Sequence, residues 1–94
     1  MSEDESSVYE QVTLDQLHPG EECFLQGYQG DEEIHLRLKE LGLIRGVRIA
    51  VKRFAPLGDP MEVMVRGFHL SLRKKDASYL IVKKTNPVES GNHV

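Results

Sequence analysis

The sequence predicts a mainly β domain: a small antiparallel β-barrel of about five short strands, with one α-helix inserted after the first strand. Two observations predict this fold. Several short runs alternate apolar and polar residues, as half-buried strands do, and only residues 31–43 carry helical spacing instead. Glycine and proline clusters separate these runs. Because a small open sheet exposes unpaired strand edges, we expect the sheet to curl into a barrel.

The first predicted elements are a lead-in segment and a strand. Residues 13–17 are expected to contain a short helical turn, which Pro19 and Gly20 stop. Residues 22–28 then form the first strand of the barrel. The turn signal in residues 27–31 ends this strand and leads into the helix.

Residues 31–43 carry the signals of one amphipathic helix with defined ends. Asp31 is expected to cap the helix by accepting a hydrogen bond from an early backbone N–H. Glu33 and Arg37 are spaced for an ion pair on the helix surface. Gly42 stands where a left-handed C-terminal cap is expected, and Leu43 can fold back onto the last turn. The i, i+4 and i+7 positions form one apolar stripe of Ile34, Leu38 and Leu41.

After Gly46 the spacing changes to that of strands. Apolar residues alternate with polar ones from Val47 to Val51, and Phe54 then breaks the alternation, which predicts a bulge or bend. A second run alternates from Met61 to Val65.

Between these two runs lies Ala55-Pro56-Leu57-Gly58-Asp59-Pro60, the predicted turn of a long β-hairpin. Its two prolines cannot donate a hydrogen bond inside a central strand, so they frame a turn at Gly58 and Asp59. Gly67 is expected to form the next corner, before a short strand over residues 69–72. Residues 76–78 form a turn that can hold one helical turn, and residues 79–84 form the last strand. The resulting architecture is a small SH3-like barrel. We assign structural turn or cap roles to Gly42, Gly46, Gly58 and Gly67.

The 94 residues are predicted to form one domain with two tails. Residues 1–11 are expected to be a disordered acidic extension, residues 12–85 the folded domain and residues 86–94 a disordered tail. Only 39% of the residues are hydrophobic and 6% aromatic, so we expect a mostly aliphatic core.

The charges are divided unevenly along the chain. Residues 1–36 hold ten acidic side chains and no lysine or arginine, whereas residues 37–94 hold twelve basic and five acidic ones. The basic part alone could suggest nucleic acid. We favour the interpretation that its lysines and arginines are solvated sides of strands, so no nucleic-acid partner is expected.

The sequence favours a cytoplasmic location. The chain has one cysteine, Cys23, which cannot form an internal disulfide and so favours a reducing compartment. The acidic N-terminus is wrong for a signal peptide, and no apolar run approaches the roughly 20 residues of a membrane span.

No pattern of catalytic residues stands out, so we expect no enzymatic activity, no cofactor and no small-molecule substrate. Cys23 lies in an apolar strand, where a structural cysteine is the usual case. No glycine-rich phosphate loop is present, and the serines at 6, 71 and 78 do not stand in a strand–turn–helix context for a nucleophile. His18, Cys23, His35, His69 and His93 lack the paired spacing of metal ligands, so no metal site is predicted. Cys23 and His35 stay weak metal candidates, because their strand and helix are neighbours in the chain.

Three blocks of the sequence stand out together: Arg37-Leu38 with Glu40-Leu41-Gly42-Leu43 and Gly46, then residues 55–60, then Leu72-Arg73-Lys74-Lys75-Asp76. In this order and spacing they resemble one known family, FeoA, the ferrous iron transport protein A. The resemblance covers roughly residues 12–84. It implies a small cytoplasmic SH3-like protein that binds and modulates the cytoplasmic side of FeoB, the GTP-dependent ferrous iron transporter.

The resemblance also implies where the protein would act and which alternative function has to be considered. It would reach the inner membrane only through the transporter, and weak self-association stays open. A related fold forms the C-terminal domain of iron-dependent repressors, so a metal-responsive or DNA-associated regulatory domain is the alternative. That alternative lacks its DNA-binding half here, since no helix-turn-helix precedes the barrel.

Two groups of residues are the predicted partner-binding surface. Leu57 and Met61 flank the hairpin turn, where turn residues are usually polar, and an exposed apolar tip would mark a contact site. Leu57 could instead fold back onto Phe54 or onto the end of the helix. The basic cluster Arg73, Lys74 and Lys75 follows in the sequence, either as a solvated corner or as part of the same docking surface.

Overall fold

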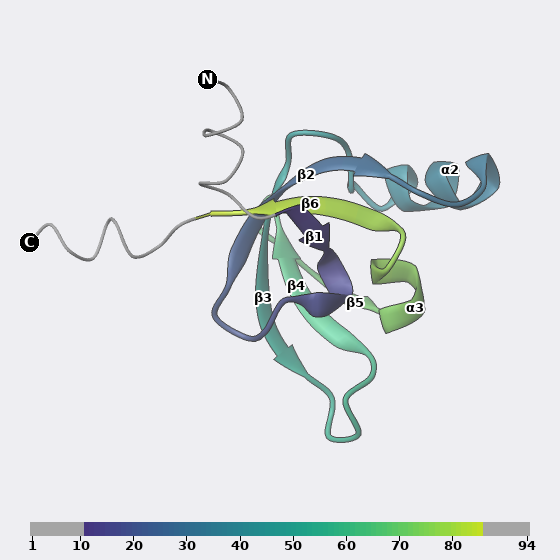
Figure 1. Ribbon diagram of the computed structural model, residues 1–94. Coiled ribbons are helices and arrows are strands. Elements are labelled where there is room, and N and C mark those ends of the chain that lie inside the picture. The colour runs from purple at the N-terminus through teal and green to yellow at the C-terminus, as the bar shows by residue number, and fades with distance from the viewer. Residues whose placement is uncertain (1–10, 86–94) are drawn as a thin grey trace, which may run out of the picture.

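The computed structural model describes residues 11–85 of the protein (Figure 1). The two predicted disordered tails therefore lie outside the described residues, apart from Gln11, at which the first strand begins. The elements follow in the order β1 (Gln11–Thr13), the 3₁₀ turn η1 (Leu14–Gln16), β2 (Glu22–Tyr28), α2 (Glu32–Glu40), β3 (Arg48–Phe54), β4 (Met61–Val65), β5 (Phe68–Leu72), α3 (Lys74–Ala77) and β6 (Leu80–Lys84).

The strands form a single antiparallel sheet with the order β1-β6-β2-β3-β4-β5. The mainly β class is confirmed, with two corrections. The sheet has six strands rather than five, and the helix follows the second strand rather than the first. Strand β1 was missed because its three residues are too few to show a period; it is defined by its pairing with β6. Within residues 11–85 the outer strands β1 and β5 do not pair with each other, so the curled sheet is not closed by hydrogen bonds.

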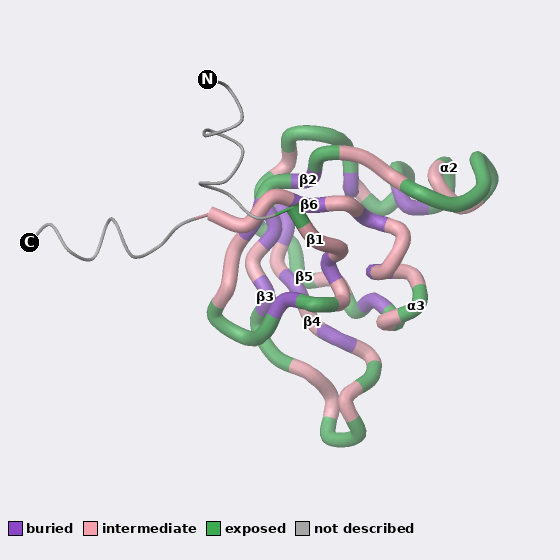
Figure 2. Tube along the Cα trace, viewed as in Figure 1, coloured by how far each residue is buried: buried purple, intermediate pink, exposed green. Residues whose placement is uncertain are grey.

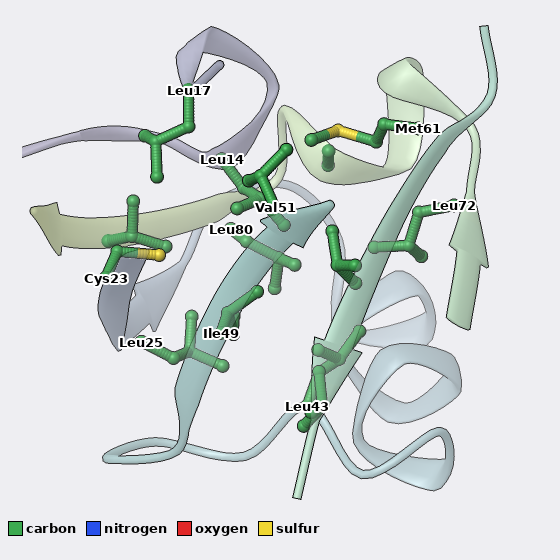
Figure 3. Packing of buried hydrophobic residues seen from close by; sticks show 14 of the residues in the cluster. Leu14, Leu17, Cys23, Leu25, Leu43, Ile49, Val51, Met61, Leu72 and Leu80 are labelled. Carbon is green, nitrogen blue, oxygen red and sulfur yellow. The ribbon is translucent and has the colours of Figure 1, made fainter. Parts of the chain in front are cut away.

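The core lies inside the curl of the sheet (Figures 2 and 3). It is aliphatic, as predicted, and in the described part of the chain no polar or charged residue is buried. Its largest fully buried side chains come from nearly every element and are Leu14, Leu17, Leu25, Leu38, Leu43, Ile49, Met61 and Leu80. Packing of these side chains fixes how the turns and helices sit on the sheet.

Helix α2 contacts the core along a narrower stripe than predicted. Leu38 is buried, but Ile34 is only half-buried and Leu41 is 46% exposed. The helix lies beyond the end of β2 and projects away from the sheet (Figure 1), so only one line of its side chains reaches the core. The predicted capping by the Asp31 side chain is wrong: its carboxylate makes no cap hydrogen bond, and its backbone oxygen accepts from the N–H groups of Ile34 and His35.

The C-terminal end of α2 is formed as predicted. Gly42 has a φ of +96°, which side chains strongly disfavour, and its N–H donates to the oxygen of Lys39 at 2.9 Å. The N–H of Leu43 donates to the oxygen of Leu38 at 3.2 Å, and its side chain turns back into the core. These two bonds make a Schellman cap. The other assigned turn glycines, Gly46, Gly58 and Gly67, also have positive φ.

The bulge predicted near Phe54 is present in β3. The pairing of β3 with β4 shifts between Val51 and Arg53, and Phe54 then pairs with Met61 at the base of the hairpin turn. This shift changes which side chains of β3 face the core, because each extra residue reverses the alternation.

Candidate partner-binding surface

The hairpin turn between β3 and β4 is a fixed and protruding tip (Figures 1 and 2). The N–H of Ala55 donates to the oxygen of Pro60 at 2.9 Å, and the N–H of Gly58 donates to the oxygen of Ala55 at 2.7 Å. Leu57 stands at the end of this turn and is 95% exposed. The alternative in which Leu57 folds back onto Phe54 is therefore wrong, and the exposed apolar tip is present.

Met61 does not belong to this surface, which corrects its predicted role. Its side chain is fully buried, and Figure 3 shows it among the core side chains with Leu72 and Val51. The turn closes between Ala55 and Pro60, so Met61 is already the first residue of β4 and shares the inner face with Val63 and Val65. A residue inside this core is not available to a partner.

The middle residue of the basic cluster, Lys74, contacts the hairpin, whereas Arg73 and Lys75 on either side of Lys74 do not pair with the hairpin. Arg73 precedes α3, and Lys74 and Lys75 form its first turn. The backbone N–H of Lys74 donates to Oδ1 of Asp59 at 2.9 Å, and its Nζ lies 4.2 Å from the centroid of the Phe54 ring. Lys74 is thus engaged within the protein, while Arg73 and Lys75 are exposed beside the tip.

Replacing Asp59 with alanine is expected to lower the free energy of unfolding by about 0.5–2 kcal/mol, because the first N–H of α3 loses its acceptor. Chemical denaturation followed by circular dichroism measures this loss. Asp31→Ala is the matched control, since the Asp31 side chain makes no cap hydrogen bond, and a smaller loss is expected there. Asp59→Asn retains an acceptor oxygen and should recover most of the stability; equal losses for Asp59→Ala and Asp31→Ala would contradict the capping role.

A groove runs between α2, the hairpin and α3. It has a volume of about 470 Å³ and is lined by Ile34, Arg37, Asp59, Arg73, Lys75, Asp76 and Tyr79. Nη2 of Arg37 lies 3.0 Å from Oδ1 of Asp76, so Arg37 pairs across the groove rather than with Glu33 as predicted. Ile34, Arg37 and Tyr79 could not be predicted as residues of this site, because only folding brings α2 next to α3.

A second, smaller groove of about 360 Å³ lies between the end of α2 and the β4–β5 turn, lined by Glu40, Leu41, Gly42, Val65, Arg66 and Phe68. Phe68 is 71% exposed there and was not among the predicted surface residues. Its place directly after the Gly67 turn was the available signal, since the first residue of a strand is often incompletely covered.

The two weak metal candidates lie far apart: Cys23 is near the start of β2, and His35 lies in α2, next to the last residue of β2. Cys23 is buried and pairs in register with Ile49, and burial raises the pKa of its thiol to about 12, with the carboxylates of Glu22 and Glu21 adding to the rise. His35 stacks on the ring of Tyr28, and the two ring centroids lie 5.1 Å apart. Five residue steps of strand separate Cys23 from Tyr28, a span of about 17 Å. In the described part of the chain no three histidine, cysteine or acidic side chains are grouped to hold a metal ion; His93 lies outside it.

None of the helices within residues 11–85 is long and apolar enough to cross a membrane.

Comparison with known proteins identifies the family of this chain. Residues 12–84 match the model of the FeoA domain. A protein of Porphyromonas gingivalis, a fusion of Fe(2+) transport protein A with the Fe(2+) transporter FeoB, is 31% identical over 72 residues; the match covers 77% of this chain and only 8% of that relative.

Solved structures agree with this match. The FeoA protein of Chlorobium tepidum is 35% identical with a TM-score of 0.73, covering 80% of this chain and 71% of that one. FeoA of Stenotrophomonas maltophilia, a prokaryotic SH3 domain protein solved with zinc, is 27% identical with a TM-score of 0.66, covering 76% and 88%. IdeR of T. acidophilum, at 21% identity and a TM-score of 0.70 over 80% of this chain and 34% of that one, shares the fold. With the family model spanning nearly all of the described domain, the chain belongs to the FeoA family.

Proposed function

We propose that this protein is a non-enzymatic, cytoplasmic accessory protein of ferrous iron uptake that acts by direct contact with the transporter FeoB. The observation that carries the proposal is the relative in which both parts are joined in one chain. Fusion holds two domains at a high effective concentration, which favours a contact between them. The proposal extends that contact to two separate chains.

The exposed tip and the neighbouring cations are the proposed contact surface, made of Leu57, Arg73 and Lys75. Leu57 offers an apolar side chain that a pocket on the partner can cover, and burying a leucine contributes about 1.5–3 kcal/mol. Arg73 and Lys75 would steer an acidic partner surface toward the tip. The hydrogen bonds that close the turn support this proposal, because a fixed tip loses little conformational entropy on binding.

Docking on FeoB would modulate transport by stabilising one state of its cytoplasmic domain. A bound protein shifts such an equilibrium only by its differential affinity for the two states. The alternative, a metal-responsive or DNA-associated regulator, is supported by fold alone, since the similar repressor structure is only 21% identical. We therefore propose only the accessory role.

The test is binding of the full chain to the purified cytoplasmic domain of FeoB from the same organism, measured by isothermal titration calorimetry. The variant Leu57→Ser with Arg73→Glu and Lys75→Glu is expected to weaken binding by at least about tenfold, or 1.4 kcal/mol. The control variant Leu36→Ser with Lys52→Glu changes an exposed leucine and an exposed lysine away from the tip and should bind as the unchanged protein does. Absence of binding by the unchanged protein, or equal weakening by the control, would refute the proposed surface.

A further inference from the structure

The groove between α2, the hairpin and α3 has two cations that pair with no residue in the described range 11–85. Both of its carboxylates are engaged inside the protein: Asp59 accepts from the N–H of Lys74, and Asp76 pairs with Arg37. The side chains of Arg73 and Lys75 line the same groove, are exposed, and form no hydrogen bond or ion pair with any residue in 11–85. The groove therefore presents two positive charges that its own acidic residues do not neutralise.

Two cations nearer to the start of β1 are, in contrast, paired with glutamates. Nε of Arg48 donates to Oε1 of Glu22 at 3.0 Å, and Nζ of Lys84 lies 3.2 Å from Oε2 of Glu21. Lys52 and Arg66 also lack a partner among the described residues, but neither lines this groove. Arg73 and Lys75 thus form the pair of neighbouring cations that is open to an anionic ligand.

The chain itself carries a ligand of the matching charge. Its first ten residues, Met-Ser-Glu-Asp-Glu-Ser-Ser-Val-Tyr-Glu, contain four carboxylates and no lysine or arginine. We propose that the acidic run Glu3-Asp4-Glu5 binds in this groove and pairs with Arg73 and Lys75. The acidic run thereby occupies an interaction surface that a partner with carboxylates would also use.

The connecting residues are long enough for this contact. Gln11 pairs with Lys83, and from there β6 runs back to Leu80, next to Tyr79 on the wall of the groove. Four residue steps along the strand separate Lys83 from Tyr79, a distance of about 13 Å. Six residue steps link Glu5 to Gln11 and span about 20 Å when fully extended, which exceeds the distance between Lys83 and Tyr79. Because β1 is antiparallel to β6, the acidic run has to turn back toward Tyr79 to reach the groove.

Tethering makes weak ion pairs effective here. An exposed ion pair contributes little alone and is screened by salt. A segment attached a few residues away meets its site at an effective concentration near the millimolar range, so several weak pairs suffice for substantial occupancy. The contact should therefore be intramolecular, independent of protein concentration and strongly dependent on ionic strength.

The contact between the acidic run and the groove does not depend on the proposed function. Its expected effect on binding to FeoB does. The acidic run and FeoB would compete for Arg73 and Lys75, so the segment would lower the apparent affinity for the transporter. A partner would then have to supply enough contact at the Leu57 tip to displace it.

A spin label at position 2 tests the contact in the full chain without any partner. Ser2→Cys provides the attachment point, and Cys23 should not compete because it is buried and its thiol stays protonated. Paramagnetic broadening of backbone amide signals is expected to concentrate on residues 34–37 and 73–76. It should be lost in Arg73→Glu with Lys75→Glu, and also at about 1 M salt, where the Debye length is about 3 Å.

Two matched variants complete the design. Lys52→Glu changes the net charge by the same sign outside the groove and should retain the broadening. Reversing the acidic run (Glu3→Lys, Asp4→Lys, Glu5→Lys) should abolish it, and combining that reversal with Arg73→Glu and Lys75→Glu should restore it. Broadening that centres on other residues, that survives loss of both groove cations, or that grows with protein concentration would overturn the proposal. Because FeoB is absent, failure here leaves the transporter-binding test to be judged separately.

Discussion

Replacing Gly30 with alanine is expected to lower the free energy of unfolding by about 2–5 kcal/mol, the sum of backbone strain and overpacking. Gly30 has a φ of +95°, and a Cβ there would lie 2.8 Å from Cδ1 of Tyr79. The ring cannot retreat easily, because the backbone of Tyr79 is held on both sides: its N–H donates to Asp76, and its oxygen accepts from the N–H of Gln29. Thermal or urea denaturation measures the effect.

Gly20 provides a matched control for this prediction. It has the same φ of +95°, but a Cβ there would meet no atom within 4 Å. Gly20→Ala therefore reports the strain alone, and the difference between the two variants reports the contact with Tyr79. Tyr79→Leu should recover part of the loss in Gly30→Ala by removing the ring; equal losses at positions 20 and 30 would contradict the packing argument.

Met61→Ala is expected to destabilise the protein by about 2–5 kcal/mol, as truncation of a fully buried methionine usually does. The side chain is fully covered in the core and leaves a cavity that its neighbours fill only in part. Urea denaturation measures the change in the free energy of unfolding. Met64→Ala is the matched control in the same strand, because Met64 is only half-buried on the outward side, and a clearly smaller loss is expected.

The same measurement separates core from contact surface in this hairpin. Leu57→Ala removes a side chain that is 95% exposed and should change stability by no more than about 0.5 kcal/mol. A large loss for Leu57→Ala with little loss for Met61→Ala would reverse the assignment of the two residues made from the structure.

Features carried by a few neighbouring residues could be predicted from the sequence. The glycine after Leu41 predicts the end of α2, since a positive φ and the returning Leu43 are local properties. The break in alternation before Phe54 predicts the bulge in β3 for the same reason. The three conspicuous blocks likewise predicted the FeoA family, which the match over residues 12–84 confirms.

Features that depend on long-range contacts could not be predicted in this way. Arg37 is spaced for Glu33, but α3 brings Asp76 within reach, and the ion pair forms there instead. Met61 and Leu57 looked equivalent beside the turn, yet the position at which the turn closes places one in the core and the other in solvent.

The strand and helix periods, the turn residues and the family could be predicted from the sequence, because each is encoded in neighbouring side chains and backbone preferences. The composition of the candidate surface, in contrast, depends on how the folded elements pack together. Asp59 from the hairpin accepts a hydrogen bond from the backbone of Lys74, and Asp76 from α3 pairs with Arg37. Among residues 11–85, the cations of this groove that stay open to a ligand are therefore Arg73 and Lys75. That selection depends on distances between elements far apart in the chain, which no local pattern contains.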